Sequence, residues 1–452
     1  MPVFRTISFG LCVAALLAGL ATASPPRRHH AIALRETTIL PEVAPESVGF
    51  SGERLGVLNA AMHSAVDKGE VAGIVTLLAR HGKIVSFDAY GKRSLALGTP
   101  MTKDTIFRMY SQTKPMTAVA MLILYEEGKW QMNDPVAKFV PEFADLKVFA
   151  GLDKDGKPIL ENPKHPPTMR ELMTHTAGFG YGLSDKDWVD QQFQKQHVLQ
   201  SNGLQEMIGK VASIPLLYQP GTRWSYSIGV DIQGYIIEKL SGQSLADFMA
   251  TRIFKPLGMV DTGFIVPPDK VARFSSVYIK SAQTGGLLEV TPAMSPMVQD
   301  FTKPPLMDSG GGGSLSTAED SARFYQMLLD GGALGDARIL SPASVRLMGS
   351  DVLESSVQAE DNNVGLPPIG GDALGFGLDV AIDKSSAKLG ALVGDGSFWW
   401  GGAAGTWFWI DPKNDLFFIG LIQRFNRGAA GDVALVPLSQ SLVYSALLDP
   451  AK

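Results

Sequence analysis

The sequence predicts an α/β (α+β) fold in which an antiparallel sheet, built from both ends of the chain, is flanked by helices. Alternating apolar patterns typical of strands occur at 71–90 and again at 376–423, whereas residues 111–330 are rich in helical patterns and loops. A chain of 452 residues is long enough to bury a large core. We therefore expect a discontinuous α/β sheet domain, 45–110 plus 331–450, interrupted by a mainly helical domain at 111–330.

The first residues have the order of segments found in a secretory signal. Arg5 precedes an apolar stretch at 7–20, which is followed by the small-residue sequence Ala21-Thr22-Ala23. An apolar stretch of this length is short for a membrane span. We expect a signal peptide at 1–23 and a flexible leader at 24–44. The mature protein would then be exported, periplasmic or secreted, with no stable membrane insertion.

The first elements after the leader are predicted to be a helix and a pair of strands. Apolar residues recur at helical spacing from 51 to 69. The segments 71–79 and 83–90 have strand character and flank the turn sequence Arg80-His81-Gly82. This arrangement predicts a helix followed by two paired strands.

The last part of the chain is predicted to supply further strands and a final helix. The turn residues of Asp411-Pro412-Lys413-Asn414-Asp415 indicate a hairpin between two of these strands. A helix is expected from about 432 to 448. The expected strands are 376–382, 399–404, 406–410 and 416–423.

The glycine-rich run Asp308-Ser309-Gly310-Gly311-Gly312-Gly313 is not a nucleotide-binding loop. A phosphate-cradling loop ends in Gly-Lys-Ser/Thr, whereas Ser314-Leu315 follows here. The next residues, Ser316-Thr317-Ala318-Glu319, have the pattern of a capping box that starts a helix. We interpret the run as a tight connection packed near a site.

The amino-acid composition and the missing motifs argue against several classes of function. The net charge of −5 gives no sign of nucleic-acid binding, and nothing in the sequence indicates the oligomeric state. The single cysteine, Cys12, lies inside the expected signal peptide, so the mature protein would have neither disulfides nor a catalytic thiol. Scattered histidines without metal-ligand spacing argue against a metal, and the absence of Gly-x-Ser-x-Gly disfavours an α/β-hydrolase.

The tetrad Ser111-Gln112-Thr113-Lys114 is the first candidate for chemistry. A hydroxyl and an amine three positions apart share one face of a helix, which places a nucleophile beside a group able to take its proton. The residues that follow, 116–125, are apolar on every side, as in a buried helix. Ser111 is therefore expected at the N-terminus of that helix, where the dipole favours negative charge.

Two later segments complete the pattern: 220–229, which contains Tyr226, and Trp399-Trp400-Gly401-Gly402-Ala403-Ala404-Gly405-Thr406. With the three motifs in this order, the chain resembles the serine β-lactamase and penicillin-binding-protein superfamily. It is most similar to the class C β-lactamase-like branch that includes the family VIII carboxylesterases, over about 45–447. The resemblance implies a β-lactamase/DD-peptidase-like fold.

The resemblance also implies roles for individual residues. Ser111 corresponds to the nucleophile, Lys114 to its neighbouring amine and Tyr226 to the tyrosine of the family's Tyr-x-Asn element. Either Lys114 or Tyr226 could act as the general base. The backbone N–H groups of Ser111 and Ala403 correspond to the oxyanion hole. Tyr110 and Tyr181 are rivals for the catalytic tyrosine that the resemblance disfavours.

Two departures from the family pattern bear on the substrate. Ile228 replaces the asparagine of the tyrosine element, and Trp400-Gly401-Gly402 replaces Lys-Thr-Gly. The chain thereby lacks two polar contacts for an anionic amide substrate and has an apolar, stacking surface instead. We expect Trp400, Gly401, Gly402 and Tyr181 to contact the substrate, although Trp400 could equally be part of the core.

The expected function is that of an exported serine hydrolase that cleaves carboxylic esters of short acyl chains through an acyl-enzyme on Ser111. This chemistry is expected to need no cofactor. The expected partner is a small-molecule ester or amide. One alternative with the same chemistry is a β-lactamase or a D-amino-acid peptidase (DD-peptidase). The other alternative is a catalytically silent cell-envelope binding protein that has kept the fold.

Overall fold

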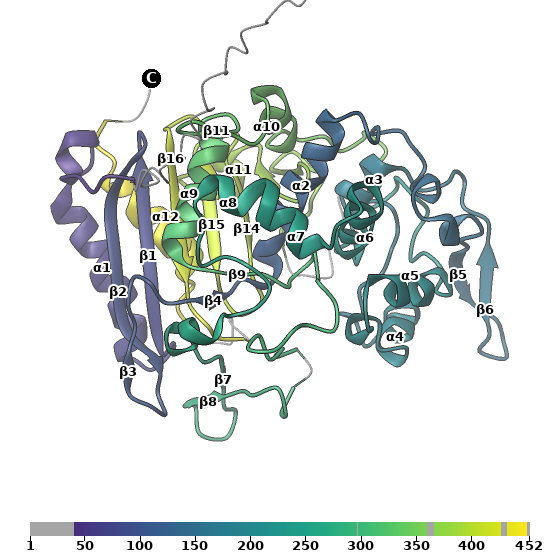
Figure 1. The fold of residues 1–452 in the computed structure, drawn as a ribbon, viewed down its shortest axis with the longest axis horizontal. Coiled ribbons are helices and arrows are strands. Elements are labelled where there is room, and N and C mark those ends of the chain that lie inside the picture. The colour runs from purple at the N-terminus through teal and green to yellow at the C-terminus, as the bar shows by residue number, and fades with distance from the viewer. Residues whose placement is uncertain (1–39, 296, 359–365, 426–431, 450–452) are drawn as a thin grey trace, which may run out of the picture. The chain divides into compact units, whose positions relative to one another are not determined.

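An antiparallel sheet joins the two ends of the chain (Figure 1). Among the described residues it has eight strands in the order β12-β13-β14-β15-β16-β1-β2-β3, and β1 pairs with β16 at its centre. The predicted fold class is therefore confirmed. The strands are β1 Gly73–Arg80, β2 Lys83–Ser94, β3 Thr99–Pro100, β12 Leu374–Phe376, β13 Ala381–Asp383, β14 Phe398–Gly401, β15 Trp407–Asp411 and β16 Leu416–Leu421.

The structure is a computed structural model that describes residues 40–295, 297–358, 366–425 and 432–449. The expected signal peptide and most of the expected leader, up to residue 39, lie outside the described residues. Residues 38–452 group into one unit, which is the one described below. Within the described ranges, no helix combines the length and apolar character that crossing a membrane requires.

Every residue of β1 is buried because helices cover both faces of the sheet. Ile74 and Leu78 pack with α1 (Gly52–Asp67) and α12 (Leu435–Ala446) on one face. Val75 and Leu77 belong to the main core on the other face, where α9 (Ala318–Leu329) packs against β1, β15 and β16. The strand is therefore mostly apolar on both faces, with Thr76 and Arg80 as its buried polar residues.

The helical part of the molecule packs around α2 (Lys114–Glu126) and α6 (Gly229–Ser241). All residues of α2 from Lys114 to Leu124 are buried, as its apolar sequence predicts. The other helices are α3 Met169–Met173, α4 Trp188–Lys195, α5 Leu204–Ala212, α7 Leu245–Met249, α8 Lys255–Leu257, α10 Pro342–Met348 and α11 Ser386–Leu389. The small two-stranded sheets pair β4 Phe107–Arg108 with β9 Leu315–Ser316, β5 Val148–Leu152 with β6 Pro158–Glu161, β7 Tyr278–Lys280 with β8 Leu287–Glu289, and β10 Ala333–Leu334 with β11 Ala337–Arg338.

Two local predictions are wrong. The single strand expected at 376–382 is a hairpin, because Asp379 has a left-handed backbone (φ 57°) and the Gly377 N–H bonds to the Val380 carbonyl to close a turn. The helix after the glycine-rich run is capped by Thr317, which accepts a hydrogen bond from Asp320 N–H. Ser316, the expected cap, instead belongs to β9.

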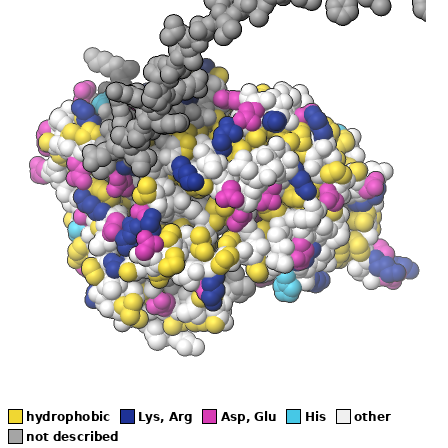
Figure 2. Space-filling model, in the orientation of Figure 1, with side chains coloured by type: hydrophobic (Ala, Val, Ile, Leu, Met, Phe, Trp, Pro, Cys, Tyr) yellow, Lys and Arg dark blue, Asp and Glu magenta, His cyan; other side chains and the backbone are white. Residues whose placement is uncertain are grey.

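The surface carries both signs of charge. On the face shown in Figure 2, basic and acidic side chains are interspersed with apolar ones, and single-sign regions do not stand out on the described part of that face. This agrees with the small net charge of −5.

Candidate active site

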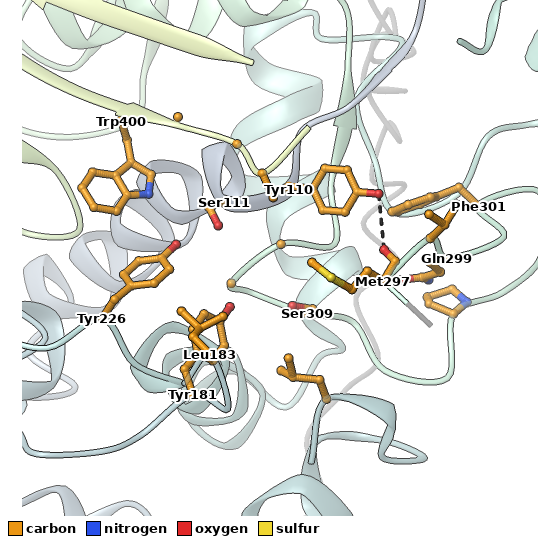
Figure 3. Close-up of a pocket in the computed structure, with 18 of the residues that line it drawn as sticks. Tyr110, Ser111, Tyr181, Leu183, Tyr226, Met297, Gln299, Phe301, Ser309 and Trp400 are labelled. Carbon is orange, nitrogen blue, oxygen red and sulfur yellow. Dashed lines mark hydrogen bonds between the residues drawn. The ribbon is translucent and has the colours of Figure 1, made fainter. Parts of the chain in front are cut away.

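Residues of the three sequence motifs line one pocket with a volume of about 970 Å³. Ser111 comes from the segment before α2, Tyr226 from the loop before α6, and Trp400, Gly401, Gly402 and Ala403 from the end of β14. Tyr181 lines the same pocket. Figure 3 shows the hydroxyl groups of Ser111 and Tyr226 pointing into a common space. The fold thus brings together side chains that are far apart in the sequence.

Ser111 lies in a short 3-10 helix, Tyr110–Thr113, that leads directly into α2. Tyr110 has a left-handed backbone (φ 47°), which is uncommon for a residue with a side chain. Because Lys114 is three residues after Ser111, its Nζ reaches back to within 3.4 Å of Ser111 Oγ. Ser111 therefore lies at the N-terminal end of α2, as expected, but in a 3-10 turn that precedes the first regular turn of the helix.

The Lys114 ammonium group is fully buried and surrounded by oxygen atoms. Besides Ser111 Oγ, it donates to the carbonyl oxygen of Gly311 at 2.6 Å and approaches Tyr181 Oη at 3.4 Å. Burial lowers its pKa, but the negative charge that Tyr181, Tyr226 and Asp231 can carry raises it more, and the net pKa lies above the usual lysine value. Lys114 is therefore held as a cation at neutral pH.

The aromatic ring of Tyr226 packs against the Lys114 ammonium group. Lys114 Nζ lies 4.6 Å from the centroid of the Tyr226 ring. The ring also packs against Trp400 and Tyr181, with centroid distances of 5.5 Å and 5.3 Å. Burial raises the pKa of Tyr181 well above the usual tyrosine value. The reactive groups are thus enclosed by aromatic surface.

Asp231, in the first turn of α6, anchors the glycine-rich run beside Lys114. Its Oδ1 accepts hydrogen bonds from Ser309 Oγ at 2.5 Å and from Gly311 N–H at 3.1 Å. A Cβ atom on Gly311 would lie 2.5 Å from Asp231 Oδ2 and 3.0 Å from Tyr181 Oη, so only glycine fits there. The run therefore presents the carbonyl group that holds Lys114, in keeping with its interpretation as a tight connection near a site.

Sequence reasoning did not single out Asp231 as a functional residue. An acidic residue in the first turn of a helix is ordinary, since it complements the helix dipole. Its complete burial, next to Gln233 and the apolar residues of the same helix, is visible only in the structure. Burial raises the pKa of Asp231, while the neighbouring Lys114 lowers it.

The third motif packs directly against the backbone that carries the nucleophile. Gly402 lies so close to Met109 that an added Cβ would be 2.3 Å from the Met109 carbonyl oxygen. Thr406 Oγ1 donates to the same oxygen at 3.2 Å. Ala403, the next residue, is exposed in the pocket lining. The backbone of Ala403 is therefore positioned relative to Ser111 through the contact between Gly402 and Met109.

The two residues that depart from the family pattern have different positions. Trp400 is almost completely buried, yet it lines the pocket and packs on Tyr226. Ile228 is fully buried, and its N–H donates to the Gly180 carbonyl oxygen at 3.0 Å. It is absent from the described pocket lining. Only Trp400 is thus placed to touch a ligand.

His175 lies behind Tyr226 in a buried polar cluster. Its Nδ1 is 2.8 Å from Ser227 Oγ, and its Nε2 is 3.8 Å from Asp379 Oδ1. Burial lowers the pKa of His175 and raises that of Asp379, which favours the neutral forms of both. Gln233 donates to Asp379 at 3.2 Å. Within the described ranges, no three His, Cys, Asp or Glu side chains are grouped so that they could hold a metal ion.

A serine hydroxyl, a buried ammonium group and a tyrosine around one pocket beside an antiparallel sheet define a serine hydrolase of the β-lactamase fold. The family model described as Beta-lactamase matches residues 58–437, and the chain belongs to this family.

Individual relatives support this assignment. Protein Rv1367c of Mycobacterium tuberculosis is 35% identical over 372 residues, which cover 81% of this chain and 89% of that protein. Esterase EstB of Burkholderia gladioli is 27% identical over 404 residues, or 84% and 92% of the two chains. The structure of EstCE1, described as a hydrolase with promiscuous acyltransferase activity, has a TM-score of 0.69 at 24% identity and covers 86% of this chain and 98% of its own. The last similarity concerns the fold alone.

Proposed function

We propose that the protein hydrolyses carboxylic esters, including those of short acyl chains, through an acyl-enzyme on Ser111. The observation that carries the proposal is the position of the Lys114 ammonium group, 3.4 Å from Ser111 Oγ and 4.6 Å from the centroid of the Tyr226 ring, buried behind the largely apolar pocket that Ser111 and Tyr226 line. A nucleophile, a fixed positive charge and a proton carrier are the groups that acyl transfer requires.

In the proposed mechanism, Tyr226 is the base, because the raised pKa of Lys114 keeps that lysine protonated. The Tyr226 oxygen takes the proton of Ser111 as Oγ bonds to the ester carbonyl carbon. The carbonyl oxygen becomes an oxyanion, to which the N–H groups of Ser111 and Ala403 donate.

Collapse of this intermediate breaks the bond to the alcohol oxygen, which leaves with the proton held by Tyr226. Water then attacks the acyl-enzyme and gives its proton to Tyr226. The second intermediate releases the carboxylic acid, and Ser111 Oγ recovers a proton from Tyr226. Each proton taken is returned, so the site needs no cofactor for this reaction.

The preference for esters over anionic lactams or peptides follows from the charge of the lining. Trp400 lies in the pocket lining at the position that corresponds to the lysine of the β-lactamase Lys-Thr-Gly motif, and it offers stacking surface in place of a cation. The charged side chains in the described lining are Asp300 and Lys303, whose Oδ2 and Nζ atoms lie 3.1 Å apart. A substrate carboxylate would therefore enter without a free cation to pair with, which is costly.

The test compares kcat/KM for p-nitrophenyl butyrate with that for a chromogenic cephalosporin. We expect the ester to be preferred, and Ser111→Ala to abolish its turnover while the melting temperature stays close to that of the wild type. Mass spectrometry should find an acyl adduct on the peptide that carries residue 111. A larger kcat/KM for the cephalosporin would favour a β-lactamase or peptidase. Failure of a fluorophosphonate probe to label the protein would favour a silent binding protein.

We also propose that the protein is exported after cleavage following Ala23, on the strength of the amino-acid pattern at 1–23. N-terminal sequencing of the protein from its native host tests this. A mature N-terminus at Ser24 is expected, and recovery of Met1 from the cytoplasm would contradict export.

A further inference from the structure

The pocket extends beyond Ser111 to an apolar mouth that the proposed chemistry does not use. Four large apolar side chains that line it remain 42% to 65% exposed: Leu183, Leu199, Met297 and Leu306. They come from two segments far apart in the sequence, and we refer to these four residues as the apolar mouth. Exposed apolar side chains gathered around one cavity mark a binding site, whereas single ones scattered over a surface do not.

The wall of the pocket connects this mouth to the nucleophile. Tyr110 Oη donates to the Met297 carbonyl oxygen at 3.3 Å (Figure 3). Tyr110 immediately precedes Ser111, and Val298 and Phe301 are buried in the same wall. Burial raises the pKa of Tyr110 to about 12, so its side chain is uncharged at neutral pH. A ligand in the mouth would thus be continuous with a group bonded to Ser111.

The lining also determines the charge of the ligand. As noted above, its charged residues within the described ranges are Asp300 and Lys303, which pair with each other. The Lys303 side chain is 75% exposed, so this pair belongs to the edge of the pocket, and a charged group deeper inside would lose water without gaining a partner of opposite charge from the described lining. An uncharged, apolar group is the ligand that this lining accommodates.

We propose that the apolar mouth binds a bulky, uncharged hydrocarbon part of an ester, such as a fused-ring or branched group, while the ester carbonyl lies at Ser111. This inference rests on the proposed function, since the reacting bond must be one that Ser111 attacks. The cavity volume of about 970 Å³ is near the upper end of pockets that hold drug-sized ligands, roughly 300–1,000 Å³. An ester with two small groups would leave the mouth in contact with water.

Two series of esters test the proposal on the whole protein. One series keeps the p-nitrophenol leaving group and enlarges the acyl group; the other keeps acetate and enlarges the alcohol. We expect kcat/KM to rise tenfold or more from the smallest member to the fused-ring member in at least one series, since each added apolar group in such a pocket contributes several-fold or more. A carboxylated analogue of the fused-ring ester should lose this gain.

Charged substitutions assign the effect to the mouth. Leu306→Asp and Leu183→Asp should each lower the ratio of kcat/KM for the fused-ring ester to that for p-nitrophenyl acetate by about tenfold. Leu97→Asp is the matched control, because Leu97 is 78% exposed and does not line the pocket. It should leave the ratio unchanged.

The two proposals fail in different ways. If the wild type and both mouth variants hydrolyse small esters and show the same ratio of kcat/KM for the fused-ring ester to that for p-nitrophenyl acetate, the proposal that the apolar mouth binds the substrate is overturned. This result would leave the proposed esterase function standing. A decline in kcat/KM with size in both series has the same meaning. If the folded protein hydrolyses no ester in either series, the proposed function is contradicted. The proposal that the apolar mouth is an ester subsite then fails as well.

Discussion

Substitution of Gly402 by alanine tests the contact that positions the third motif against the nucleophile. The added Cβ would lie 2.3 Å from the Met109 carbonyl oxygen and 2.4 Å from Thr406 Oγ1. Carbon and oxygen atoms normally approach to about 3.3 Å, so the end of β14 and the backbone before Ser111 must separate by about 1 Å.

A separation of this size is expected to impair catalysis far more than folding. A misplacement of about 1 Å at a reacting centre can cost about 100-fold in rate, which corresponds to about 2.7 kcal/mol. The loss of one oxyanion donor costs a similar amount or more. Overpacking costs about 1–3 kcal/mol of stability, less than the roughly 5–15 kcal/mol that a native protein has. We expect kcat/KM for p-nitrophenyl butyrate to fall about 100-fold in a protein that remains folded.

The adjacent glycine provides the comparison. In Gly401→Ala the added Cβ would meet the Thr406 carbonyl oxygen at 3.1 Å and Trp407 Cβ at 4.0 Å, so far less movement is needed. Its loss in kcat/KM should be much smaller than that of Gly402→Ala. Circular dichroism and melting temperature establish that both variants are folded. Equal kcat/KM values for the two variants would refute the argument that the contact between Gly402 and Met109 sets the geometry around Ser111.

Three further predictions concern the reactive groups and the lining. Tyr226→Phe keeps the ring packing but removes the proton carrier, so ester turnover should fall by about 100-fold or more at an unchanged melting temperature; wild-type turnover would exclude Tyr226 from proton transfer. Asp231→Asn removes a carboxylate that raises the pKa of Lys114, so the ammonium group should lose its proton at lower pH. The alkaline limb of the plot of kcat/KM against pH should therefore move to lower pH. An alkaline limb at the wild-type pH would contradict this role of Asp231. Trp400→Lys should raise the ratio of kcat/KM for the cephalosporin to kcat/KM for the ester. Ile228→Asn lies at a buried site outside the pocket lining, so it should leave this ratio unchanged and only lower the melting temperature, because it buries an unpaired amide. A raised ratio in Ile228→Asn would contradict the conclusion that only Trp400 is placed to touch a ligand.

Local patterns were sufficient to predict much of the fold. The alternation around Arg80-His81-Gly82 predicted the hairpin of β1 and β2, and the turn at 411–415 predicted that of β15 and β16. The segment 376–382 shows where such reasoning fails, because its apolar residues continue through a turn. That turn depends on the conformation of Asp379, whose partners are His175 and Gln233 from the helical part of the chain. Composition alone does not reveal such distant constraints.

The candidate site was predictable to the extent that its residues occur in recognisable motifs. Ser111, Lys114 and Tyr226 line or adjoin one pocket, as their motifs suggested. Asp231 and the carbonyl group of Gly311 were not identified, because their contribution depends on burial and on backbone geometry. The apolar mouth was missed for a related reason, since leucine and methionine in separate loops form a pattern only in three dimensions.

The hydrogen bond from Thr406 to Met109 has a consequence for protein synthesis. It joins residues 297 positions apart in the sequence. While the chain is still on the ribosome, Ser111 emerges long before β14 has been made. A nascent polypeptide that already carries the nucleophile therefore still lacks Gly402 and Ala403, which line the pocket beside it in the folded protein. Under the proposed mechanism, ester hydrolysis can begin only after β14 and β15 have been synthesised and have docked beside Ser111. Synthesis of the nucleophile and the start of catalysis are therefore separated in time.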